Sequence, residues 1–204
     1  SGVSARLTIS ALESVISAAE RRALRNGEER TVVRIGDLQA VVPAITGKIE
    51  LVYEGEQEGP EKVAHHLLGL SIRNVFSELF PDPAKARKRS GPEKSPQKQR
   101  PDPYAGIIAY FDGSQADLMS DAPNDAYGEV LGNVPGLHDL VRNQHAYLEA
   151  WEVAVWSEFV LHGLAEHSRV GRSMLVGKVS FSDLFDSVLS RSDEDDGDDR
   201  SPGG

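Results

Sequence analysis

The chain has 204 residues, with 22 basic and 32 acidic side chains that give a net charge of −10, and it contains no cysteine. This acidic balance argues against nucleic acid as a partner, and the lack of thiols excludes disulfides, thiolate nucleophiles and sulfur-ligated zinc. No apolar run approaches the ~18 residues that a membrane span requires, and no secretory signal opens the chain. We therefore expect a cytoplasmic protein. Because the chain opens at Ser1 instead of a methionine, we expect it to be a piece of a longer protein.

Two segments of unusual composition divide the chain. Residues 81–103 hold six of the eleven prolines and have seven basic against three acidic residues, a local charge of +4. Such a segment buries too little apolar surface to fold, so we predict a disordered basic linker. Residues 191–204 contain six acidic and two basic residues and are predicted to form a disordered acidic tail. Two domains remain, at 1–80 and 104–190.

The first domain is predicted to be helical. A capping box at Ser10–Glu13 begins a helix with one apolar stripe, and Asn26-Gly27 ends it. Residues 31–35 form a short extended run, and a second, short helix follows at 37–42. A third helix is predicted over 61–80, where apolar residues recur at helical spacing up to Pro81.

The second domain is predicted to be mostly helical with some β-structure. The apolar run at 107–111 has the length of a buried strand. The longest helix is predicted at 145–167 and contains both tryptophans, Trp151 and Trp156. Shorter helices are predicted at 126–131, 137–142 and 182–189. The expected fold class is mainly α, a small helical bundle followed by an α(+β) accessory domain.

No complete catalytic constellation appears in the sequence. A phosphate-binding G-x-x-x-x-G-K-[ST] loop, a G-x-G-x-x-G fingerprint and a G-x-S-x-G elbow are all absent. The six histidines have no metal-ligand spacing, and the aspartates between 112 and 125 are read as turn caps. We therefore predict no catalytic residue and no metal ligand in this chain.

The opening segment SGVSARL, directly before the first helix, resembles the sensor 2 segment of AAA+ ATPases of the magnesium chelatase and MoxR type. The resemblance covers about residues 1–53 and implies a helical lid domain. It implies that Arg6, with Ser4, contacts the nucleotide phosphate. A guanidinium held at a helix start can make paired, charge-assisted bonds to such a group.

The same resemblance implies partners and cofactors. ATP and Mg²⁺ would bind to the parent ATPase, whose P-loop core would lie upstream, and not to this chain alone. Such enzymes form homo-oligomeric rings that couple ATP hydrolysis to remodelling or metal insertion in a partner protein. A protein of the von Willebrand A type is often that partner. This chain is then part of an ATPase and is not catalytic by itself.

Two alternatives remain open. The chain could be a non-enzymatic interaction module, in which Trp151 and Trp156 form a binding face. It could also be the C-terminal part of a sigma-54-type transcriptional activator ATPase. That alternative is less favoured because residues 104–190 show no basic recognition helix.

Overall fold

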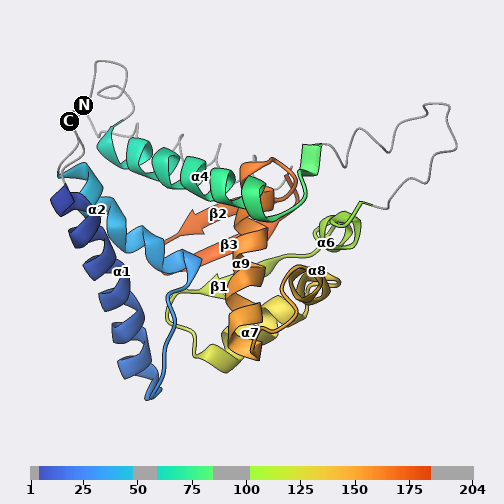
Figure 1. Cartoon of the computed structure of the whole chain (residues 1–204), viewed down its shortest axis with the longest axis horizontal. Helices are drawn as coiled ribbons and strands as arrows, with labels where there is room; N and C mark the ends of the chain where they lie inside the picture. Colours follow the sequence, from blue (N-terminus) through green and yellow to red (C-terminus); the bar gives the residue numbers. More distant parts are fainter. Residues whose placement is uncertain (1–4, 48–58, 85–101, 185–204) are drawn as a thin grey trace, which may run out of the picture.

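The computed structural model describes residues 5–47, 59–84 and 102–184 (Figure 1). These residues form a mainly helical structure with one small sheet, which confirms the predicted fold class. The helices are α1 (Ala5–Asn26), the 3₁₀ helix η1 (Ile35–Val41), α2 (Val42–Thr46), α4 (Pro60–Leu79), α6 (Ala105–Tyr110), α7 (Asn124–Gly132), α8 (Leu137–Gln144) and α9 (Ala150–Glu166). The strands are β1 (Ala116–Met119), β2 (Gly171–Leu175) and β3 (Lys178–Ser182). Among these described helices, none is long and apolar enough to cross a membrane.

Helix α9 runs through the middle of the molecule (Figure 1). Its residues from Val153 to Leu164 are buried on almost every side. A helix that is apolar all round is stable only where other elements surround it. Helices α4, α7 and α8, together with strand β2, contact α9 and supply that surrounding layer.

The three strands form an antiparallel sheet in the order β1–β3–β2. In the central strand, Val179 and Phe181 point into the core, and Phe181 lies opposite Ala116 of β1. The turn between β2 and β3 contains Gly177 at φ +76°, a left-handed conformation that glycine adopts without strain. The sequence patterns do not predict this hairpin, because strands of five residues offer only two or three alternating positions.

The two segments predicted as separate domains pack against each other. The larger buried cluster includes Phe76 and Phe80 of the first segment together with Tyr104 and most of α9 from the second. The Phe76 ring is fully buried and stacks on Phe80 with their centroids 5.2 Å apart. A smaller cluster joins α1, η1, α2 and α4 through Val15, Val41, Val42, Ile45 and Ala64. Helix α4 therefore contributes to both clusters.

The described ends of the predicted linker, residues 81–84 and 102–103, belong to the fold. The Tyr104 hydroxyl donates a hydrogen bond to the Pro81 carbonyl at 2.5 Å. Arg169 donates to the Pro83 carbonyl at 2.6 Å and pairs with Asp102 at 3.0 Å. Both ends are thus held beside the end of α9. Residues 85–101 and the predicted tail at 191–204 lie outside the described residues.

The predicted strand at 107–111 is wrong, because this run lies in helix α6 and at its C-terminal cap. Ile107 and Phe111, four residues apart, both face the core, as helical periodicity requires. A five-residue apolar run cannot distinguish the two structures by itself. The strand of this region is β1, in the segment that was expected to consist of turns.

Three further local predictions need correction. Helix α1 begins at Ala5, so Ser10 lies inside the helix and does not cap it. The short helix predicted at 37–42 is a 3₁₀ helix that starts at Ile35 and continues into α2. Ser182, predicted to begin a last helix, ends strand β3, and most of that predicted helix lies outside the described residues.

Candidate functional site

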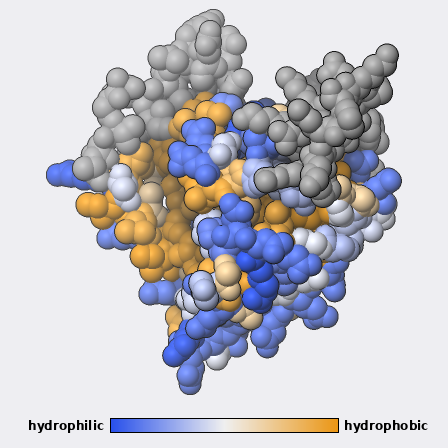
Figure 2. Space-filling view, turned by 45° about the vertical axis from the view of Figure 1, so that its right-hand side comes forward, coloured by the Kyte–Doolittle hydropathy of each residue, from blue (hydrophilic) through white to orange (hydrophobic). Residues whose placement is uncertain are grey.

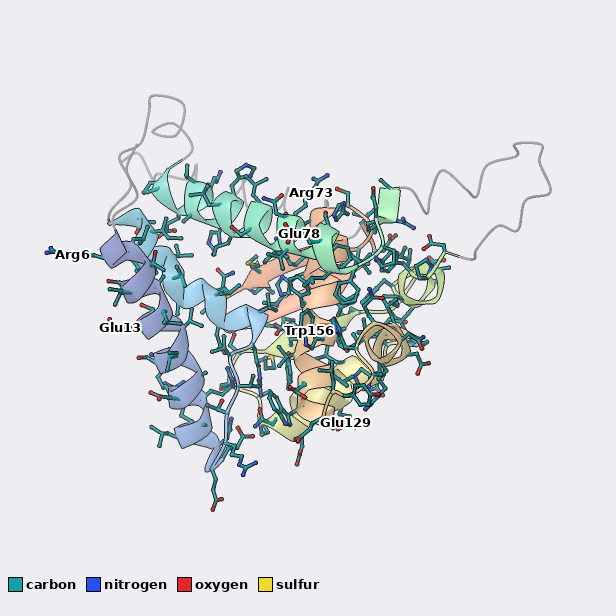
Figure 3. The ribbon with its side chains drawn as sticks, viewed as in Figure 1. Arg6, Glu13, Arg73, Glu78, Glu129 and Trp156 are labelled. Atoms are coloured by element: carbon teal, nitrogen blue, oxygen red, sulfur yellow. The ribbon has the colours of Figure 1, made fainter. Side chains whose placement is uncertain are left out.

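Arg6, the predicted sensor 2 residue, lies in the first turn of α1 and is exposed. Its side chain extends away from the body of the molecule (Figure 3). Ser4, the second predicted binding residue, lies outside the described residues. The structure therefore places Arg6 at an accessible helix end.

The two tryptophans of α9 have different surroundings. Trp151 is 48% exposed, and its indole N–H donates to the carboxylate of Glu149. Trp156 is half-buried and packs on His145 and Phe80, with ring centroids 4.8 Å and 6.2 Å away. The two rings therefore do not form one shared binding face.

A buried ionic group joins α1 to η1. The Arg22 guanidinium is almost fully buried and donates to the Asp37 carboxylate at 2.6 Å. It also donates to the Val32 carbonyl at 2.7 Å, which holds the extended segment before η1. The second Asp37 oxygen accepts the backbone N–H of Arg34 at 2.8 Å, so Asp37 supplies the N3 contact of a capping box at the start of η1.

Glu158 lies in the middle of α9, beside this group, and is only 2% exposed. Its two oxygens accept the backbone N–H groups of Ile35 and Gly36, at 2.7 Å and 3.0 Å. The first N–H groups of a helix have no partner within that helix, and a carboxylate is well suited to receive them. The Tyr127 hydroxyl donates a third hydrogen bond at 2.8 Å. Glu158 thus connects α9 to η1 and α7.

These contacts determine the charge state of the carboxylate. Burial alone would raise the pKa of Glu158, but nearby His162, the Tyr127 hydroxyl and the Ile35 N–H together hold that pKa below its usual value. The same environment raises the pKa of Tyr127, through burial first and the adjacent carboxylate second. Glu158 is therefore ionised and Tyr127 is neutral around pH 7.

His162 lies one helical turn after Glu158, with its Nε2 atom 3.7 Å from a Glu158 oxygen. Arg172 lies 3.0 Å from the Nδ1 atom of His162, and arginine can only donate, so Nδ1 accepts and the ring proton is on Nε2. Burial lowers the pKa of His162 more than the nearby carboxylate raises it. The ring is neutral and directs its N–H toward Glu158.

Arg34 completes the cluster on the side of α7. Its guanidinium carbon lies 4.0 Å from the centre of the Tyr127 ring, within the range of a cation–π contact. It donates hydrogen bonds to the Ala122 carbonyl and to the side chain of Asn124, both at 2.9 Å. The loop before η1 is thereby attached to the segment that precedes α7.

The buried cluster has little room for a substrate. The cavity bordered by Arg34, Tyr127 and Glu158 has a volume of about 10 Å³, which is enough for about one water molecule. Both oxygens of Glu158 already accept hydrogen bonds. The geometry is that of a structural connection between the two halves and not of a reaction centre.

The aspartates and histidines considered from sequence are dispersed. Asp117 lies in β1 and does not cap a turn; it accepts from Ser180 at 2.6 Å and pairs with Lys178 at 2.9 Å. Over residues 5–47, 59–84 and 102–184, no three His, Asp or Glu side chains converge as a metal site requires.

The Glu158–His162 pair was not recognised from the sequence, although a signal exists. Both residues lie inside a helix that is otherwise apolar on all sides, where a charged residue is costly unless it is paired. An ionisable residue at such a position predicts a buried partner. The partners themselves come from η1, α7 and β2, and no local pattern identifies them.

No protein-family model, no curated protein and no solved structure matches this chain.

Proposed function

We propose that this chain is the lid and accessory region of an AAA+ ATPase of the magnesium chelatase or MoxR type. The observation that carries the proposal is the position of Arg6, exposed in the first turn of a 22-residue helix and directed away from the rest of the molecule. A sensor 2 arginine has to reach a nucleotide that another domain holds. An accessible helix start, supported by a packed bundle, meets that requirement.

The arrangement behind Arg6 also supports the proposal. Helices α1, α2 and α4 share the small buried cluster with η1. Helix α1 is therefore packed against the rest of this bundle and would move together with it. In the proposed mechanism, the Arg6 guanidinium contacts the γ-phosphate of ATP. When that phosphate leaves after hydrolysis, the arginine loses its partner and the lid reorients. The buried cluster around Glu158 transmits this rotation to the second half of the chain.

The remaining parts of the proposal concern partners. The P-loop core of the ATPase supplies the site for ATP and Mg²⁺, and the assembly is a homo-oligomeric ring in the cytoplasm. The second half of the chain, around α9, contacts the protein that is remodelled or receives a metal, or a von Willebrand A-type partner.

The test is ATP turnover by the ATPase that carries this segment, with and without Arg6→Ala. Loss of one charge-assisted hydrogen bond costs about 1.5–3 kcal/mol, so turnover should fall roughly 10- to 150-fold. Arg30→Ala is the matched control, because Arg30 is an exposed arginine beyond the other end of the same helix. Equal turnover in the two variants contradicts the proposal, as does ATP hydrolysis by this chain alone.

A second candidate, a protein-interaction module, is favoured by exposed apolar side chains on α1. Ile9, Leu12 and Ile16 are 58%, 61% and 41% exposed and share one side of the helix. Hydrophobic surface is also gathered toward one side of the space-filling view in Figure 2. If Arg6→Ala leaves turnover unchanged while Leu12→Ser abolishes binding to a co-purified partner, this candidate replaces the first.

A further inference from the structure

A cleft with a volume of about 350 Å³ lies between the C-terminal half of α1, helix η1 and the residues that follow β1. Its size is at the lower end of the range for small-molecule sites. Three arginines of α1, namely Arg21, Arg22 and Arg25, line one wall. Asp37, Ser120 and Asp121 are among the residues that line the remainder.

The arginines leave unused hydrogen-bond donors at this cleft. Arg21 and Arg25 are exposed, and within the described parts of the chain neither has a hydrogen bond or an ion pair. Arg22 is paired with Asp37, but its buried Nε–H group has no hydrogen-bond partner among the described residues. Such an unpaired buried donor is unusual and costly.

The charge of the cleft is positive in an otherwise acidic protein. Three guanidinium groups face two carboxylates, and the Asp37 carboxylate is already neutralised by Arg22. Arg21 and Arg25 lie one helical turn apart, where like charges repel and weaken a helix slightly. A bound anion between them would remove that repulsion and satisfy both guanidinium groups.

The rest of the lining indicates what is attached to the anion. The Ser120 hydroxyl, the Asp121 carboxylate and the carboxamide of Gln39 are polar, and among the described residues only two alanines line the cleft with apolar side chains. No aromatic ring from the described part of the chain lines it, so a nucleotide base finds no described ring on which to stack. Carboxylate, hydroxyl and amide groups can instead form hydrogen bonds with a ligand whose uncharged part is rich in hydroxyl groups.

We propose that this cleft binds a phosphorylated polyol of the sugar phosphate class, with the phosphate on Arg21 and Arg25 and the hydroxyl groups on Ser120 and Asp121. The site is separate from Arg6. Arg25 follows Arg6 by 19 positions in α1 (25 − 6), which corresponds to about 28 Å along the helix axis.

The test is calorimetric titration of this chain with glucose 6-phosphate, with inorganic phosphate and glucose in parallel. We expect saturable binding of one glucose 6-phosphate per chain, at least tenfold tighter than either fragment. The double variant Arg21→Gln/Arg25→Gln should weaken binding by more than tenfold, and Asp121→Asn should weaken it by a smaller factor. Both arginines are exposed, so the fold should tolerate these changes.

Arg142→Gln is the matched control, because it removes an exposed arginine from α8, on the other side of the molecule from α1 (Figure 1). Its affinity should equal that of the unmodified chain. Absence of saturable binding, equal binding of inorganic phosphate, or an unchanged affinity in the double variant would each overturn the proposal. The measurement requires no ATP hydrolysis, so its failure is distinct from failure of the lid assignment.

Discussion

Glu158 shows how one side chain can hold distant parts of the chain together. Its carboxylate receives two backbone N–H groups of η1 and the Tyr127 hydroxyl, from residues that are 31 to 123 positions away in the sequence. A buried charge of this kind is stable only with such partners, and each partner in turn has lost its contact with water.

We therefore expect Glu158→Ala to destabilise the protein by about 3–5 kcal/mol, because removing one member of a buried charged cluster leaves the others unpaired. The free energy of unfolding in urea measures this. Glu129→Ala, an exposed glutamate on α7 (Figure 3), is the control and should change stability by less than about 0.5 kcal/mol. If both variants were equally stable, the hydrogen bonds of Glu158 would make no net contribution to the free energy of unfolding, and the expectation would be wrong.

At the scale of elements, two glycines lie where α4 and α9 cross, and one of them permits the close approach of the helices. A Cβ atom added to Gly163 would lie 2.1 Å from a ring carbon of Phe76, and one added to Gly69 would lie 2.7 Å from the Glu166 carboxylate. The obstacle at Gly69 is the end of a flexible side chain, whereas the Phe76 ring is fully buried and stacked. The helices can therefore approach this closely only because Gly163 has no side chain.

Gly163→Ala should consequently destabilise the protein by about 1–3 kcal/mol, the usual cost of overpacking a core. Gly128→Ala is a matched control in the interior of α7, where an added Cβ meets nothing within 4 Å. That change should be neutral or stabilising by up to about 1 kcal/mol, since alanine is the better helix former. Thermal unfolding of the two variants side by side gives the comparison, and a Gly163→Ala variant as stable as the control would refute the packing argument.

At the scale of the whole molecule, the large buried cluster contains residues from both sides of the 81–103 segment. The C-terminal end of α4 and the second half of the chain therefore lose their packing together. Unfolding of either half exposes Phe76, Phe80 and Tyr104.

We expect unfolding in urea to be a single transition, with coincident curves from far-ultraviolet circular dichroism and tryptophan fluorescence. The tryptophans report on α9 alone, whereas the dichroism reports on all helices, so two independent domains would give separate curves. Phe76→Ala should reduce the free energy of unfolding by about 3–5 kcal/mol. The midpoints of both curves should therefore move to lower urea concentration by the same amount. A dichroism transition that Phe76→Ala leaves in place would show that α1 and α2 unfold independently.

Much of the helical content was predictable because it rests on local patterns. The apolar stripe of α4 and the stop at Pro81 predict the third helix almost as it is observed, at Pro60–Leu79. The end of α1 at Asn26 was predicted correctly from Asn26-Gly27, whereas its start was placed at the capping-box pattern of Ser10–Glu13 and lies at Ala5. Helix α6 was predicted to be a strand, and strand β1 was not predicted. A run of four to six residues contains too few positions to distinguish helical from strand periodicity.

By itself the sequence determined the mainly α fold class, the approximate positions of the long helices and the absence of thiol chemistry. These properties depend on composition and on spacings within one helix. Only the tertiary structure decided that α4 joins the two halves, that Glu158 caps η1, and that Arg21 and Arg25 face Asp121 across a cleft. Each of these contacts joins residues far apart in the chain, and their pairing depends on how the helices cross, which no local pattern contains.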